Sequence, residues 1–136
     1  MLRTILLQAE RLKQRTSFPA VGLQFSRFLQ FKTLVEHRFR SLRKVGGYAA
    51  EMGVSSRNLN RVIHVASGLN AKDFVDARVV LELKRLLAHT DLGLKEITSV
   101  MTFDEPTNLV KYFRQRTGLT PMEFRAAWRR RNAILP

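Results

Sequence analysis

The stretch TGLTPMEF, residues 117 to 124, decides the fold because it ends one helix and starts the next. Gly118 suits the left-handed residue that terminates a helix. Thr120 and Glu123 have the spacing of a capping box, which opens a helix. An earlier stretch, SGLNAKDF at residues 67 to 74, has the same order of a small residue, Gly, Leu, a capping residue, an acid and Phe. The sequence therefore carries one helix-stop, helix-start signal twice.

The similarity continues upstream of both stretches, which indicates a duplicated structural unit. Leu59 corresponds to Leu109 at an offset of 50 residues. Further upstream, Met52-Gly53-Val54 corresponds to Met101-Thr102-Phe103 at an offset of 49, so the second copy has gained one residue in its turn. A helix-turn-helix followed by a capped helix, present twice, is the simplest account of the pattern. Ser55 is the expected N-cap of the second helix in the first copy.

Nearly every segment has the helical period, so the sequence predicts an all-α fold of two helix-turn-helix subdomains joined by a long connector helix. We expect residues 1–24 to form an N-terminal helix and a linker, with the linker at 15–24 around Pro19 and Gly22. The N-terminal helix carries an apolar stripe of Ile5, Leu6, Ala9 and Leu12. A second domain is expected over 25–132, with a helix at 25–42, the first helix-turn-helix at 45–67, the connector at 71–89, the second helix-turn-helix at 94–118 and a last helix at 121–131.

The charge balance is strongly basic, because 24 Lys and Arg against 11 Asp and Glu give a net charge of +13. An excess of this size favours a polyanionic partner, most often nucleic acid and less often an anionic membrane. No apolar run reaches the roughly 18 residues that a bilayer-spanning helix needs. The chain has 0 Cys, which excludes disulfides and thiolate metal sites and suits a cytoplasmic protein.

Residues suited to catalysis or metal binding do not cluster in the sequence. His37, His64 and His89 lack the spacing of metal ligands. No nucleophile with a base, carboxylate pair or phosphate loop has a workable spacing. We therefore expect no enzyme activity, no catalytic residue, no metal and no cofactor.

Two long segments are YAAEMGVSSRNLNRVI, residues 48–63, and DARVVLELKRLLAHTDLGLKEITSVMTFDEPTNLVKYFRQRTGLTPMEFR, residues 76–125. Both resemble the C-terminal DNA-binding domain of the AraC/XylS family of bacterial transcription regulators. The resemblance covers about residues 28 to 128. Its most specific residues are Phe103-Asp104, Tyr112-Phe113-Arg114, Thr117-Gly118, Thr120-Pro121 and Phe124-Arg125.

The resemblance implies that two helices, 56–66 and 105–117, enter the major groove of double-stranded DNA. The residues it places toward DNA are Ser56, Arg57, Asn60, Arg61, Pro106, Thr107, Asn108 and Lys111, while Leu59, Val62 and Ile63 pack inward. Arg can bind guanine and Asn adenine through two hydrogen bonds, so these residue types suit base reading. Lys111 is expected to meet phosphate, with Thr107 and Asn108 as base readers.

The resemblance also bears on partners and on the limits of the chain. It implies RNA polymerase as a protein partner, and both activation and repression are compatible with the sequence. Many family members carry an upstream effector-sensing domain, and residues 1–27 are too short for one. The apolar stripe of the N-terminal helix resembles the last helix before the DNA-binding domain in such members, so residues 1–24 are expected to be the remnant of an upstream domain. We expect a fragment or a truncated member, with an effector only if a sensing domain is present in the full-length protein. A homodimer is compatible with the sequence, and a membrane partner is not expected.

Several residues allow two interpretations. Thr102 stands where the family usually has Gly, at a turn that favours positive φ, so the second turn is expected to be strained or rearranged. Arg78 suits either a phosphate contact or a buried, capping role. Arg129, Arg130 and Arg131 suit a solvated tail, with phosphate contact as the lesser alternative.

Three classes of function are compatible with the sequence. The first is a sequence-specific regulator that inserts two recognition helices into adjacent major grooves, about 34 Å apart on B-DNA. The alternative is a basic helical nucleic-acid-binding structural protein without sequence specificity, held by charge alone. A third class, a membrane-surface protein, suits residues 1–14 at most.

Overall fold

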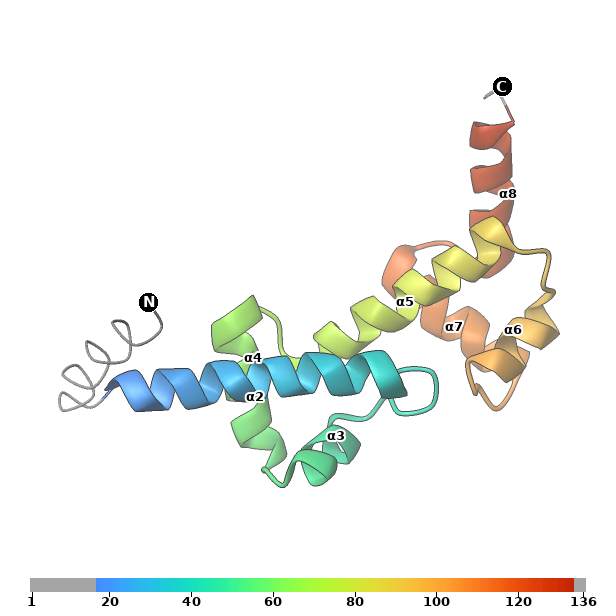
Figure 1. The fold of residues 1–136 in the computed structure, drawn as a ribbon. Coiled ribbons are helices and arrows are strands. Elements are labelled where there is room, and N and C mark those ends of the chain that lie inside the picture. The colour runs from blue at the N-terminus through green and yellow to red at the C-terminus, as the bar shows by residue number, and fades with distance from the viewer. Residues whose placement is uncertain (1–16, 134–136) are drawn as a thin grey trace. The chain divides into compact units, whose positions relative to one another are not determined.

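A computed structural model describes residues 17–133, and all regular elements in that range are α-helices (Figure 1). The helices are α2 (Ser17–Arg38), α3 (Val45–Met52), α4 (Ser56–Ser67), α5 (Ala71–His89), α6 (Leu94–Val100), α7 (Pro106–Thr117) and α8 (Pro121–Asn132). The predicted all-α fold, with helix-turn-helix pairs α3–α4 and α6–α7 and α5 as the connector, is confirmed. The N-terminal helix predicted ahead of the linker lies outside the described residues. Within the described part of the chain, every helix is too short or too polar to cross a bilayer.

The predicted linker over 15–24 is wrong from Ser17 onward, because α2 already begins there. Pro19 lies in the first turn of α2, where the backbone N–H has no partner within the helix and proline removes no hydrogen bond. Gly22 costs about 1 kcal/mol relative to Ala inside a helix, which a helix of 22 residues tolerates. The C-terminal end also differs from the predicted 42, because Ser41 and Leu42 donate their N–H groups to the Arg38 carbonyl in a turn. The assignment of residues 1–24 to an upstream domain stays a prediction.

The described helices divide into two compact units. The first comprises α2 up to Glu36 and residues 44–71, with α3 and α4. Its core includes Phe31 and Tyr48, whose rings meet edge to face with centroids 5.5 Å apart. The inward positions predicted for α4, Leu59, Val62 and Ile63, are buried as expected. This unit therefore packs the first helix-turn-helix on α2.

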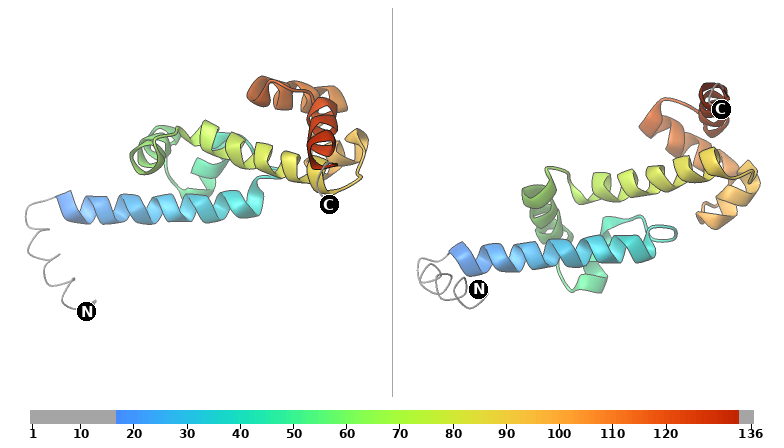
Figure 2. Two further views of the ribbon diagram at one scale, coloured as in Figure 1. Left: turned by 90° about the horizontal axis from the view of Figure 1, so that it is seen from above. Right: turned by 45° about the horizontal axis from the view of Figure 1, so that its top comes forward.

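The second unit comprises residues 37–43 and the chain from Lys72 onward. In Figure 2, α6, α7 and α8 gather around the C-terminal half of α5. The core of this unit is formed by Val79, Leu83, Leu87, Ile97, Met101, Leu109 and Phe113. Leu109 and Phe113 on α7 are as deeply buried as Leu59 and Ile63 on α4, so the sequence repeat is also a repeat of core positions.

Candidate nucleic-acid interface

The α4 helix has a defined start and one exposed polar face. The Ser55 hydroxyl accepts a hydrogen bond from the Asn58 N–H at 3.0 Å, so the predicted N-cap is confirmed. Ser56, Arg57 and Arg61 are exposed, and Arg57 and Arg61 lie on the side of α4 opposite its buried residues. The structure thus exposes three of the four residues predicted for this helix, and the two arginines share one accessible side.

Asn60, the fourth predicted residue on α4, has a structural role. It is half-buried, and its Oδ1 accepts a hydrogen bond from the Ala71 N–H at 2.9 Å. Ala71 is the first residue of α5, whose N–H has no acceptor within the helix. Asn60 therefore caps α5, and a two-bond contact to adenine would have to share the same oxygen. Base reading by Asn60 stays a prediction.

A cation from α2 lies beside the start of α4. The guanidinium of Arg27 donates to Asn58 Oδ1 at 3.3 Å. The pair is separated by 31 residues in the chain, so no local pattern in the sequence indicated it. Arg27 adds a positive charge next to the helix end that already favours anions.

The α7 helix presents the second predicted set. It begins at Pro106, which is half-buried, and Thr107, Asn108 and Lys111 are exposed along one side. Leu109 faces inward and is fully buried. The arrangement repeats that of α4, with hydroxyl, amide and ammonium groups outward and aliphatic side chains inward.

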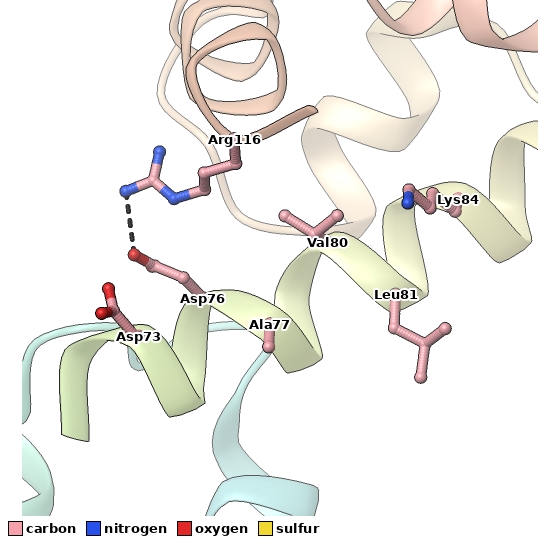
Figure 3. Close-up of a pocket in the computed structure, with 7 residues that line it drawn as sticks. All are labelled: Asp73, Asp76, Ala77, Val80, Leu81, Lys84 and Arg116. Carbon is pink, nitrogen blue, oxygen red and sulfur yellow. Dashed lines mark ion pairs between the residues drawn. The ribbon is translucent and has the colours of Figure 1, made fainter. Parts of the chain in front are cut away.

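An ionic cluster fixes α7 to α5. Tyr112 donates its hydroxyl proton to Asp76, and Arg116 lies 3.0 Å from the same carboxylate (Figure 3). Lys72 approaches it to 2.9 Å. Burial raises the pKa of Asp76, but the hydrogen bonds from Tyr112, Lys72 and Arg116 outweigh it and hold that pKa below its ordinary value. Burial and the bond to Asp76 raise the pKa of Tyr112, so the phenol stays protonated.

The turn before α7 contains Thr102, which stands where the family resemblance leads us to expect Gly. Thr102 has φ of 56°, and it is the one non-glycine residue with positive φ among residues 17–133. The expected strain is therefore present. One guanidinium nitrogen of Arg43 donates to the carbonyls of Met101 and Thr102, both at 2.8 Å. The same guanidinium lies over the Phe103 ring, 4.1 Å from its centroid, so Arg43 stabilises the turn through two hydrogen bonds and a cation–π contact.

Arg125 and Arg78, both considered in the sequence analysis, make contacts within the fold. Arg125 is buried and donates to the carbonyls of Leu86, Leu87 and Thr90, which satisfies the C-terminal end of α5. Arg78 lies over the Phe39 ring at 4.1 Å and 3.7 Å from Glu82, which favours the buried role over a phosphate contact. The described residues contain no cluster of three or more His, Asp or Glu that could hold a metal.

Two helix-turn-helix pairs whose second helices expose cationic and amide side chains, on a chain of net charge +13, define a helix-turn-helix DNA-binding protein. A family model described as a helix-turn-helix domain matches residues 48–127, more than half of the chain. The chain belongs to the AraC/XylS family of DNA-binding transcription regulators.

Solved structures share this fold. The DNA-binding domain of AdpA, a global transcriptional factor solved in complex with a target DNA, has 24% identity and a TM-score of 0.68, over 78% of this chain and 96% of that one. The C-terminal domain of the response regulator yesN from Fusobacterium nucleatum has 20% identity and a TM-score of 0.65, over 71% of this chain and 94% of that one. The C-terminal domain of AraT, a response regulator from Geobacillus stearothermophilus, has 19% identity and a TM-score of 0.67, over 74% of this chain and 84% of that one. No curated protein matches the sequence.

Proposed function

We propose that the protein is a sequence-specific transcription regulator that reads double-stranded DNA with α4 and α7, each inserted into a major groove. One observation carries this proposal. Both helices bury equivalent apolar positions and expose residues of the types that bind base edges, namely Arg57 and Arg61 on α4 and Asn108 on α7. Such pairing of an apolar anchor with a polar face is what groove insertion requires.

The exposed residues divide into two roles. Arg57 and Arg61 match guanine O6 and N7, and Asn108 matches adenine N6 and N7. Lys111 and Ser56 suit phosphate, because a hydroxyl or ammonium there positions the helix without distinguishing bases. Thr107 and Pro106 offer apolar contact to a thymine methyl group. Asn60 adds its amide NH₂ group while its oxygen caps α5.

Tandem copies in one chain lead us to propose adjacent grooves as the binding mode. The 19 residues of α5 span about 28 Å at 1.5 Å per residue, comparable to the separation of about 34 Å between successive major grooves. Because the two exposed faces differ in chemistry, the site is expected to have two unlike halves. Regulation would then act on RNA polymerase at a promoter in the cytoplasm, with any effector or dimer contact supplied by a sensing domain elsewhere in a longer protein.

Paired affinity measurements test this function. Arg57→Ala and Asn108→Ala are each expected to weaken binding to a selected site by about tenfold or more, and binding to random DNA far less. Arg130→Ala removes one exposed charge from α8, off both reading helices, and serves as the matched control. It is expected to leave the ratio of specific to random affinity unchanged. If the first two variants weakened both DNAs equally, the charge-only alternative would replace base reading.

A further inference from the structure

A groove between α5 and α8 is not accounted for by DNA reading. It has a volume of about 500 Å³, and none of the proposed DNA-contacting residues lines it. Phe124 and Trp128 form its aromatic side, with their rings stacked at a centroid distance of 6.5 Å, and His89 meets Trp128 edge to face at 5.6 Å. Leu81 on α5 lines the opposite side and is 59% exposed. The groove is therefore an open apolar surface with the packed rings of Phe124, Trp128 and His89 along one side.

The apolar surface continues along α5. A second hollow of about 420 Å³ has Ala77, Val80 and Leu81 as its apolar lining, with Asp73, Asp76 and Arg116 at its polar end, and it shares Leu81 and Lys84 with the groove (Figure 3). Together with Ala88, the apolar lining residues and Lys84 follow the helical period over α5. The stripe is roughly 17 Å long at 1.5 Å per residue, which is about three helical turns. A surface of this length and shape fits the apolar face of a second helix.

The charge of the groove between α5 and α8 limits which helix could bind in it. Four cations line the groove, Arg78, Lys84, Arg85 and Arg131, against one carboxylate, Glu82. A second copy of this chain, at a net charge of +13, is repelled. The chain's own residues 1–16 are also basic, with Glu10 as their only acid, so they do not complement the groove. DNA supplies phosphates but no aliphatic side chains for Leu81 and Trp128.

We propose that the groove between α5 and α8 docks an acidic amphipathic helix of another protein. Its aliphatic side chains would lie on Leu81 and the rings of Phe124 and Trp128, and its carboxylates beside Lys84, Arg85 and Arg131. The lining shares no residue with the sets proposed to contact DNA on α4 and α7, so the partner and DNA are expected to bind at the same time. The proposal stands on the groove's lining and charge and does not require sequence-specific reading.

Peptide titration tests the proposal, and Trp128 provides the signal because it is the only tryptophan in the chain. The probe is a helical peptide of about 15 residues with Leu at every third or fourth position and Glu on its flanks. It is expected to saturate at micromolar concentration and to shift the emission of Trp128. Leu81→Glu is expected to weaken it by at least about tenfold, through lost apolar contact and added repulsion. Leu23→Glu, at a leucine that is 53% exposed on α2, is the matched control and should bind the peptide normally.

Four further comparisons decide the outcome. Peptides with Lys in place of Glu, or with the same residues in scrambled order, are expected to bind at least about tenfold more weakly. Equal binding of either peptide would overturn the proposal.

Duplex DNA is expected to leave the bound peptide in place, and competition would assign the groove to DNA instead. If benzoate produced the Trp128 shift at the same concentration as the peptide, a small aromatic acid would be the occupant and the helix proposal would be wrong. Both glutamate variants should retain the circular dichroism and DNA affinity of the parent.

Discussion

The two helix-turn-helix units have the same turn made from different residues. In the first, Val54 donates to the Ala49 carbonyl at 3.0 Å, and in the second Phe103 donates to Thr98 at 2.9 Å. The left-handed residue is Gly53 in one turn and Thr102 in the other, with φ of 70° and 56°. The two turns therefore share a backbone conformation, and glycine, the residue that suits it, is present in only one of them. The second turn has Arg43 on its carbonyls, which stabilises a conformation that threonine disfavours.

The reading helices are also attached to α5 by different chemistry. Asn60 of α4 accepts one neutral hydrogen bond from the first N–H of α5. In α7, Tyr112 and Arg116 both bind the largely buried carboxylate of Asp76. A neutral cap tolerates small changes in its surroundings, whereas a buried carboxylate needs all its partners. The comparison predicts that the second unit is more sensitive to mutation and to acid than the first.

The largest expected effect is on the ionic cluster. Asp76→Ala leaves Tyr112 and Arg116 without their acceptor, and we expect the free energy of unfolding to fall by about 3 kcal/mol. Tyr112→Phe removes a single hydrogen bond and should cost about 1 kcal/mol. Urea denaturation followed by Trp128 fluorescence measures both, because Trp128 belongs to the second unit. Equal effects of the two variants would show that Arg116 does not depend on Asp76.

Exchanging the turn residues should move stability in opposite directions. Gly53→Thr introduces a β-branched residue at positive φ and should lower the free energy of unfolding by about 1.5 kcal/mol. No atom lies within 4 Å of a Cβ built there, so the cost is conformational and not a clash. Thr102→Gly should raise stability by roughly 0.5 kcal/mol, because relief of strain exceeds the entropy lost by glycine. A loss of stability in Thr102→Gly would mean that the threonine side chain contributes to the turn.

Substitutions of Asn60 distinguish its role in capping α5 from a role in reading DNA bases. Asn60→Ala should lower the free energy of unfolding by about 1 kcal/mol, as expected for a lost cap, and Asn60→Asp should restore it because the carboxylate still accepts the Ala71 N–H. Thermal denaturation of the three proteins measures this. Loss of DNA specificity in Asn60→Ala with unchanged stability would assign the residue to base reading alone.

Acid should weaken the second unit through its carboxylates. The pKa of Asp76 is lower in the folded protein than its ordinary value of 3.8, so its contribution to stability is complete above that pH and is lost as the pH falls through the folded pKa. Glu82 acts in the same direction, because the hydrogen bond from Arg85 lowers its pKa. Unfolding followed by Trp128 fluorescence should therefore shift to lower urea below about pH 4. Asp76→Asn should flatten this dependence, and an unchanged slope would remove Asp76 from the explanation.

Local signals in the sequence predicted much of the architecture. The bounds of α5 and the capping box of Thr120 and Glu123 depend on residues close together in the chain. The positive φ of Thr102 was expected from the family resemblance, because the family usually has Gly at that turn. The start of α2 is not evident from the sequence, because Pro19 indicates a linker unless it falls in the first turn of a helix. The Asp76–Tyr112 and Asn60–Ala71 bonds were missed because packing brings those residues together, and spacing along one helix does not encode packing.

The exposed sets on α4 and α7 came from residue types and from the family resemblance, and their role on DNA stays a prediction. Selection of bound sequences from a random double-stranded pool tests it most directly, with the parent protein, Arg57→Ala and Asn108→Ala in parallel. We expect two unlike half-sites about one helical turn apart, with Arg57→Ala relaxing one half and Asn108→Ala relaxing the other. A palindromic site, a single half-site, or relaxation of both halves by either variant would contradict it.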